Sequence, residues 1–115
     1  MTAECLFCKM VRGDIKPNTV YEDDTVLAFK DINPQAPAHI LVIPKKHIAT
    51  LNDVGPADAD LVGKLVLAAK RVAKDAGVAE SGYRLVLNCN ADAGQSVFHV
   101  HVHLLGGRFM RWPPG

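Results

Sequence analysis

A strict alternation of apolar residues and histidines near the C-terminus constrains the fold more than any other feature of this chain. The segment reads Phe98-His-Val-His-Val-His-Leu-Leu105. Successive side chains of a β-strand point to opposite faces, so His99, His101 and His103 would share one face and the apolar residues would face a core. The pattern predicts a strand over residues 98–105 that is buried on one side and chemically active on the other.

The rest of the chain predicts an α+β fold around this strand. Between Pro56 and Ala76 the apolar residues recur at helical spacing, and Gly77 suits the position just after a helix. Further strands are expected over residues 19–22, 25–30, 39–43 and 83–88, and a short helix over residues 6–11. We therefore expect one domain, residues 1–115, in which a long helix covers an antiparallel sheet of about five strands.

Composition and charge argue against several classes of partner. The 115 residues include 13 Lys+Arg and 12 Asp+Glu, a formal net charge of +1 with no long basic run, so a nucleic acid polymer is not expected as a ligand. The apolar runs are far shorter than the roughly 20 residues that cross a bilayer, and no secretory signal pattern is visible. The odd count of three cysteines suits a reducing compartment, so a cytoplasmic location away from membranes is expected.

Three histidines on one strand face call for a chemical explanation. Alternate residues of a strand lie roughly 6.6 Å apart, so all three cannot bind one metal ion, although a neighbouring pair could do so with help from elsewhere. Acid–base and nucleophilic chemistry near neutral pH is the other explanation. A histidine nucleophile with an imidazole on each side suits attack on phosphorus. A merely solvated polar face is the structural alternative.

Several blocks of the sequence together resemble the histidine-triad (HIT) family of nucleotide-binding proteins. The string His99-Val-His-Val-His103-Leu-Leu is similar to the family's signature, and residues 31–39, 41–47 and 94–99 resemble its other characteristic blocks. The ending, residues 106–115, is similar to that of the Hint branch, which contains purine nucleoside phosphoramidases. The resemblance covers nearly the whole chain and implies a HIT-like fold.

The resemblance also implies roles for individual residues. His101 would attack the α-phosphate and form a covalent nucleotidyl-histidine, while His103 would bind or protonate the phosphate and the leaving group. His39 and His99 would complete the imidazole cluster, and Asp31 would bind the ribose hydroxyls. The base would lie among apolar residues, namely Phe7, Met10, Ile15, Phe29, Ile32 and Leu41. The phosphate oxygens would be held by side chains and backbone amides of Asn88, Gly94, Gln95, Ser96 and Val97.

The residues themselves leave structural alternatives open for part of this set. Asp31 can accept hydrogen bonds from both ribose hydroxyls, but it can equally cap the turn before Asn33. Residues 93–96 can direct backbone N–H groups at an anion because Gly94 permits unusual dihedral angles, or they can form an ordinary turn. The apolar residues of the implied base pocket can equally belong to the core.

The pair Cys5-Leu-Phe-Cys8 is a second candidate site, because its spacing suits a metal chelate or a redox couple. Some HIT proteins close a structural zinc site with such a pair, and the resemblance implies the ligand set Cys5, Cys8, His47 and His99. The alternative is two small buried residues in a short helix, and Cys89 is expected to be a core residue. Catalysis itself is not expected to require a metal.

The implied function is hydrolysis of a purine nucleoside 5′-phosphoramidate at its P–N bond, through nucleotidyl-His101, with release of the nucleoside monophosphate. Two alternatives stay open: hydrolysis of dinucleoside polyphosphates, and a nucleotide-binding regulatory or scaffold protein with incidental hydrolysis. A homodimer is also expected, because an open sheet leaves unpaired edge strands. The resemblance implies that the tail, residues 108–115, reaches the partner's active site with Trp112 as its anchor; packing of Trp112 on its own chain is the alternative.

Overall fold

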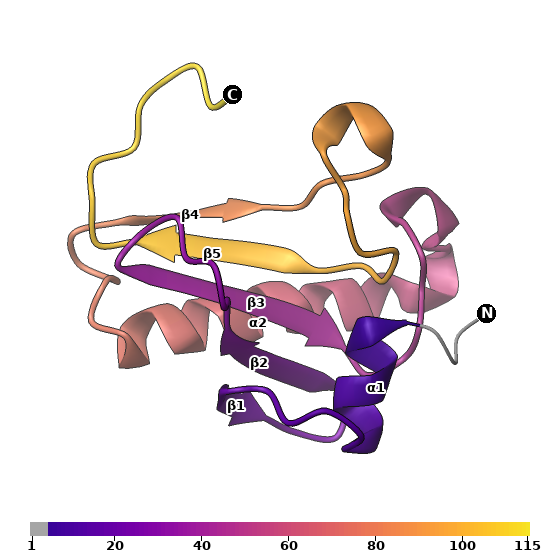
Figure 1. The fold of residues 1–115 in the computed structure, drawn as a ribbon. Coiled ribbons are helices and arrows are strands. Elements are labelled where there is room, and N and C mark those ends of the chain that lie inside the picture. The colour runs from indigo at the N-terminus through magenta and orange to yellow at the C-terminus, as the bar shows by residue number, and fades with distance from the viewer. Residues whose placement is uncertain (1–4) are drawn as a thin grey trace.

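The computed structural model describes residues 5–115, and an antiparallel sheet forms its centre (Figure 1). The sheet order is β1-β2-β3-β5-β4, and all neighbouring strands are antiparallel. The five strands are β1 (Thr19–Glu22), β2 (Val26–Lys30), β3 (Ala38–Pro44), β4 (Tyr83–Val86) and β5 (Val102–Gly106). The predicted five-stranded antiparallel sheet is thus confirmed, with β3 and β5 as neighbours in its interior.

Two helices lie on opposite faces of this sheet (Figure 1). The long helix α2 (Ala59–Asp75) crosses one face, and the short helix α1 (Leu6–Arg12) lies on the other. The predicted start of the long helix at Pro56 is corrected, because residues 56–58 form a separate 3-10 turn, η3 (Pro56–Asp58), before α2 begins. Among the described residues, every helix is too short or too polar to cross a membrane.

The alternation of side chains in β2 and β3 produces two apolar clusters, one on each face of the sheet. On the α2 face the strands contribute Val26, Ala28, Ile40, Val42, Val102 and Leu104 to the larger cluster. On the α1 face the smaller cluster contains Phe7, Leu27, Phe29, Leu41 and Ile43. Burial on both faces fixes the register of the central strands, because a slip by one residue would exchange the two clusters.

The last strand is shorter than the predicted range of residues 98–105. β5 begins at Val102, which pairs with Val42 of β3, so His103 lies within the strand while residues 98–101 lead into it. The ladder stops here because β3 ends at Pro44, which has no backbone N–H to donate. The N–H of Val100 donates instead to the carbonyl oxygen of Ile48 at 2.7 Å. His99 and His101 therefore lie outside the regular strand, and their side chains need not have the strand spacing of roughly 6.6 Å.

Candidate active site and metal site

Three imidazoles meet on the α1 face of the sheet. β3 carries His39 and β5 carries His103, and these two are diagonal neighbours because Leu41, two residues after His39, pairs with His103. His101 comes from the segment just before β5. The ring centroids of His39 and His103 are 5.2 Å apart, and those of His101 and His103 are 5.0 Å apart. The structure therefore brings together three of the four predicted catalytic histidines.

The ring of His101 has a tautomer that its hydrogen bond defines. Its Nδ1 lies 2.8 Å from the backbone oxygen of His99, and a carbonyl oxygen only accepts, so Nδ1 carries the proton. The lone pair of neutral His101 is then on Nε2. Burial lowers the pKa of His101 below its ordinary value. The neutral ring with a nucleophilic Nε2 is therefore the form favoured at neutral pH.

A second chain of hydrogen bonds defines the protons of His39 and His103. The backbone N–H of Gln35 donates to Nδ1 of His39 at 3.0 Å, which places the proton of neutral His39 on Nε2. That Nε2 donates to Nδ1 of His103 at 3.0 Å. The proton of His103 is then on its own Nε2. Burial, reinforced by the nearby His101 and His39, lowers the pKa of His103 to about 4.

These assignments give the cluster two complementary groups at neutral pH. His101 provides a lone pair on Nε2, and His103 provides an N–H donor on Nε2. A nucleophile beside a hydrogen-bond donor is the combination that substitution at a phosphate requires, because the donor stabilises the negative charge of the phosphoryl oxygens.

Asp31 makes the predicted turn contact and also faces the cluster. Its Oδ1 accepts from the backbone N–H of Asn33 at 2.8 Å, the capping interaction. Its Oδ2 lies 3.4 Å from Nε2 of His39. The two roles that the sequence left open are thus compatible in geometry, because one carboxylate oxygen holds the turn and the other lies beside the imidazoles.

Four potential metal ligands gather at the start of α1. Sγ of Cys5 lies 3.4 Å from Nδ1 of His99, and Sγ of Cys8 lies 3.2 Å from Nδ1 of His47. The two Nδ1 atoms are 3.2 Å apart. Tetrahedral zinc, with Zn–S of about 2.3 Å and Zn–N of about 2.0 Å, would hold S and N ligands about 3.5 Å apart and two N ligands about 3.3 Å apart. The geometry therefore fits a four-ligand metal site.

The second interaction of His99 supports ligation. Its Nε2 donates to the carbonyl oxygen of Pro44 at 2.7 Å, so the lone pair lies on Nδ1, the atom that faces the thiols. Burial lowers the pKa of His99 and keeps its ring in the neutral form that binds metals. A backbone carbonyl on the far nitrogen is a usual partner of a metal-bound histidine.

Asp31, His39 and His103 also place their ligand atoms within 4.8 Å of one another, yet their protons are arranged differently. Because Gln35 donates to Nδ1 of His39, the proton of His39 occupies Nε2, the atom that a cation would need. The position of the ring proton favours a metal at His99, where the ligating nitrogen is free, and disfavours one at His39, where it is protonated. This group is arranged for hydrogen bonding.

The residues implied for the base pocket fall into two sets. Phe7, Phe29 and Leu41 are buried in the cluster beneath α1, with Met10 half-buried against it. Phe7 contacts the rings of both His99 and His101 edge-on, with centroid distances of 5.8 and 5.1 Å. Ile15 and Ile32 are instead exposed, Ile32 to 99%. The buried set is core that supports the imidazoles, and the exposed pair is free to meet a ligand.

The residues implied for phosphate binding flank the turn η4 (Ala91–Ala93): Asn88 precedes it, and Gly94, Gln95, Ser96 and Val97 follow it. The buried side chain of Gln95 is occupied by backbone groups: it accepts from Asn90 N–H and donates to the oxygens of Ala49 and Val97. Gln95 thus holds the loop in shape. Ser96 is exposed and Gly94 adopts a left-handed conformation with φ of 84°. Asn88 and Val97 are half-buried beside them.

Trp112 lies on the C-terminal tail and is 81% exposed. The guanidinium carbon of Arg84 lies 5.9 Å from the centre of its ring, and Arg84 also donates to the backbone oxygen of Arg111 at 3.0 Å. Packing on its own chain therefore covers little of this side chain.

The sequence did not predict three partners of the imidazoles: the N–H of Gln35 and the carbonyl oxygens of Pro44 and His99. All three are backbone groups. Every residue supplies a carbonyl oxygen, and every residue except proline supplies an N–H. The residue types at these positions therefore carried no signal that could have identified them.

Comparison with known proteins agrees with the geometry. The chain matches the HIT domain family over residues 12–110. The purine nucleoside phosphoramidase of Escherichia coli K12 is 48% identical over 108 residues, which cover 94% of this chain and 91% of that protein. A HIT family hydrolase from Legionella pneumophila shares 55% identity at a TM-score of 0.96, over 97% of this chain and 100% of that one. A Zn-bound histidine triad family protein from Mycobacterium smegmatis shares 32% identity at a TM-score of 0.79, over 94% and 78%. The chain therefore belongs to the HIT family and is a nucleotide hydrolase.

Proposed function

We propose that this hydrolase cleaves the P–N bond of purine nucleoside 5′-phosphoramidates through a covalent nucleotidyl intermediate on Nε2 of His101. The observation that carries the proposal is the hydrogen bond from Nδ1 of His101 to the backbone oxygen of His99, because it leaves the lone pair on Nε2. The name of the Escherichia coli relative, purine nucleoside phosphoramidase, supports the choice of bond.

In this reaction Nε2 of His101 attacks the α-phosphorus as the P–N bond breaks, and the departing amine takes up a proton from water. Nε2–H of His103 donates to the phosphoryl group and stabilises its charge in the transition state. Water then attacks the phosphorus of nucleotidyl-His101 and gives its proton to the hydroxide left by the first step, the P–Nε2 bond breaks, and the nucleoside monophosphate leaves. His101 returns to its neutral form.

The substrate contacts extend outward from the imidazoles. Asp31 would accept from the ribose hydroxyls through Oδ2, since Oδ1 already accepts from Asn33. The exposed side chains of Ile15 and Ile32 would meet the purine base, with the buried Phe7, Phe29, Leu41 and Met10 as their support. The phosphate would meet Ser96, Asn88 and the backbone amides of residues 94–97, in a loop that Gln95 holds.

The metal group would hold a structural zinc ion with Cys5, Cys8, His47 and His99 as its four ligands. When bound, the ion supplies a cross-link between α1 and the segment before β5, and no step of the reaction uses it. The three cysteines are free thiols, which is compatible with the reducing cytoplasm as the place where the protein works.

The assembly that fits this fold is a homodimer through strand β4. β4 is an edge of the sheet, and unpaired edges are usually covered. Leu85 of β4 and Val66 and Leu67 of α2 are exposed large apolar residues, and Leu67 lines a shallow pocket together with Tyr83 of β4. A two-fold pairing of β4 would cover both features, and the exposed Trp112 would then contact the partner.

The test compares adenosine 5′-phosphoramidate with an adenosine dinucleotide as substrates of the full chain. We expect AMP from the phosphoramidate at the higher rate, and a nucleotidyl adduct on His101 in mass spectra after a quench that avoids acid. His101→Ala should lower kcat by at least about 1000-fold, because the nucleophile is removed. Circular dichroism establishes that the variant is folded.

The other outcomes select the alternatives. Faster turnover of the dinucleotide would favour a dinucleoside polyphosphate hydrolase. Tight binding of AMP with turnover that His101→Ala leaves unchanged would favour a nucleotide-binding regulatory protein.

A further inference from the structure

The chain that leaves β5 packs directly against the loop between β2 and β3. Gly107 has a φ of +89°, and a Cβ added there would lie only 2.9 Å from Cβ of Pro37. The next residue, Arg108, donates from Nε to the backbone oxygen of Gln35 at 3.0 Å. Gly107 and Arg108 thus hold one side of this loop, the first by close packing and the second by a hydrogen bond.

The same loop carries the donor that determines the proton of His39. The carbonyl oxygen of Gln35 accepts the hydrogen bond from Arg108, and the N–H of Gln35 donates to Nδ1 of His39. Within the loop, Nε2 of Gln35 donates to the oxygen of Asn33 at 3.0 Å, and the N–H of Asn33 donates to Asp31. A movement of Gln35 with loss of the Arg108 contact would therefore displace its N–H relative to Nδ1 of His39.

We propose that Gly107 and Arg108 are positioning residues that set the tautomers of the catalytic imidazoles. By holding Gln35 in place they keep His39 in the Nε2–H form, and through His39 they keep His103 in the Nε2–H form. The effect on the reaction rests on the proposed function above, whereas the effect on the tautomers does not.

The hydrogen-bond directions explain why one donor controls two rings. If His39 carried its proton on Nδ1, its Nε2 lone pair would face Nδ1 of His103 at 3.0 Å. His103 would then have to place its own proton on Nδ1 to make this hydrogen bond. Its Nε2 would become a lone pair, and a lone pair repels the phosphoryl oxygens that the N–H attracts. Loss of the Gln35 donor therefore exchanges donor and acceptor in the hydrogen bond between His39 and His103.

Asp31 acts in the same direction at longer range. Its Oδ2 lies 3.4 Å from Nε2 of His39, and a carboxylate there favours a proton on that nitrogen. The Gln35 N–H, at 3.0 Å from the opposite nitrogen, is the closer of the two constraints. We therefore expect removal of the tail contacts to give a mixture of tautomers.

The experiment uses full-length, metal-loaded protein with ¹⁵N-labelled histidine. Long-range ¹H–¹⁵N spectra distinguish protonated from unprotonated ring nitrogens of His39 and His103 directly. In the wild type both Nδ1 atoms should have the shift of an unprotonated nitrogen. In Arg108→Ala and Gly107→Ala these shifts should move toward the protonated value, and Arg108→Lys, which keeps a donor, should restore part of the change.

Arg84→Ala is the matched control, because Arg84 also donates to a backbone oxygen in the tail, that of Arg111, but has no bond to Gln35. Its His39 and His103 shifts should equal those of the wild type. For the phosphoramidate, Arg108→Ala should lower kcat about 3- to 10-fold with KM nearly constant, as expected for loss of one hydrogen bond that acts on the transition state.

Unchanged tautomers in Arg108→Ala would overturn the inference, and this exposed side chain can be replaced without disturbing the core. A shift of the same size in Arg84→Ala would overturn it too, because the effect would then belong to the tail in general. Failure of the proposed function gives a different result: no phosphoramidate turnover in the wild type, with tautomers that still respond to Arg108→Ala.

Discussion

At the scale of single residues, one hydrogen-bond partner determines the tautomer of each of four histidines, His39, His99, His101 and His103. His99 and His101 both donate to backbone oxygens, yet through opposite nitrogens. The lone pair of His99 consequently lies on Nδ1 beside the thiols, and that of His101 lies on Nε2. His99 also joins the two sites, because its side chain belongs to the metal group and its carbonyl oxygen orients His101.

Burial of the imidazoles predicts a loss of stability in mild acid. The pKa of His103 is lowered to about 4 in the folded protein, whereas an unfolded chain binds this proton near 6.5. Between these values the unfolded state holds more protons, so the free energy of unfolding should decrease as the pH falls from about 6.5 to about 4. Two and a half pKa units set an upper limit of about 3 kcal/mol, which partial exposure of the ring reduces.

Urea unfolding at pH 7, 5.5 and 4.5 measures this decrease. His99 and His101 contribute in the same direction because their pKa values are lowered as well. The share of His103 is therefore read from His103→Asn, whose stability should depend less steeply on pH. Equal slopes for the variant and the wild type would contradict the assignment to His103.

At the scale of elements, the proposed zinc ion would add a second attachment for α1 beside the packing of Phe7 in the smaller apolar cluster. Cys5 caps the helix through its Sγ, which accepts from the N–H of Cys8, and both cysteines face His47 and His99. A zinc ion that binds only the folded state adds about 3 kcal/mol of stability at a free concentration 100 times its Kd. We expect about one zinc per chain by elemental analysis.

Chelator treatment should lower the melting temperature of the wild type and have little effect on Cys8→Ser. Cys89→Ser is the matched control, since Cys89 lies outside the metal group, and it should retain both the zinc and the response to chelator. Metal-free wild-type protein with an unchanged melting temperature would show that the cysteines serve as packing alone.

The elements were predictable from sequence where the signal is local. Helical spacing identified α2, and period-two alternation and turn residues identified the five strands, with ends that differ by a few residues. The predicted start of β5 was wrong because Pro44, the residue that ends the β3–β5 ladder, lies in another strand. In the same way, the ligand set Cys5, Cys8, His47 and His99 followed from a family resemblance, whereas the backbone partners of the imidazoles needed the tertiary structure.

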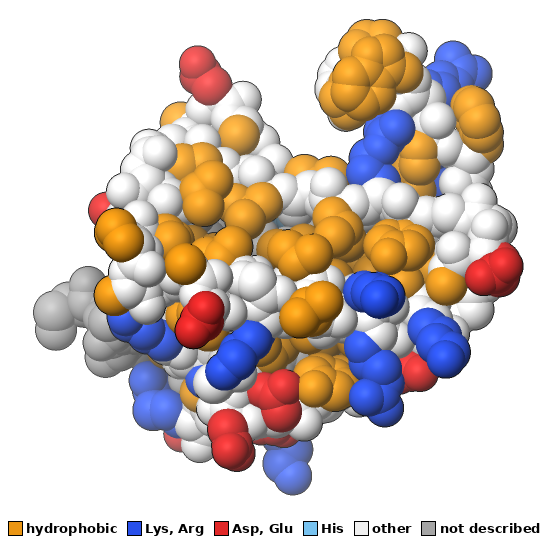
Figure 2. Space-filling model, turned by 180° about the vertical axis from the view of Figure 1, so that it is seen from behind, with side chains coloured by type: hydrophobic (Ala, Val, Ile, Leu, Met, Phe, Trp, Pro, Cys, Tyr) orange, Lys and Arg blue, Asp and Glu red, His pale blue; other side chains and the backbone are white. Residues whose placement is uncertain are grey.

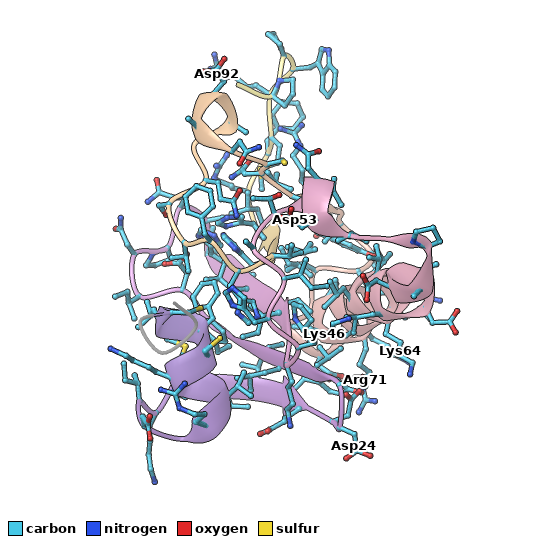
Figure 3. All side chains as sticks on the ribbon, turned by 90° about the vertical axis from the view of Figure 1, so that its right-hand side faces the viewer. Asp24, Lys46, Asp53, Lys64, Arg71 and Asp92 are labelled. Carbon is cyan, nitrogen blue, oxygen red and sulfur yellow. The ribbon has the colours of Figure 1, made fainter. Side chains whose placement is uncertain are left out.

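At the scale of the whole molecule, the imidazoles lie on the α1 side of the sheet, and the exposed residues of α2 lie on the other side. Figure 3 shows Lys64 and Arg71 on the α2 side, away from α1. Seen from that side, hydrophobic side chains gather across the middle of the surface, and a hollow separates the η4 turn from the tail (Figure 2). Apolar surface next to a strand edge is what a second copy of the chain would cover.

Disruption of this surface should therefore change the oligomeric state. Leu67 is 64% exposed on α2, and Leu67→Asp would place a charge in the proposed interface at little cost to the monomer. Sedimentation should give about twice the 12.4 kDa chain mass for the wild type and a shift toward monomer for the variant. Leu51→Asp, at an exposed leucine of η2 (Leu51–Asp53), is the control and should stay dimeric. A wild type that sediments as a monomer at all concentrations would contradict the dimer.

The use of backbone atoms as partners of the imidazoles determines how freely this site tolerates mutation. Any residue other than proline at position 35 still presents an N–H to His39, and every residue at position 44 still presents a carbonyl to His99. A saturation scan of activity should find position 35 permissive toward most side chains and intolerant of proline, whereas His101 should accept no replacement. Much of the site can therefore be preserved while the residue types that surround it drift.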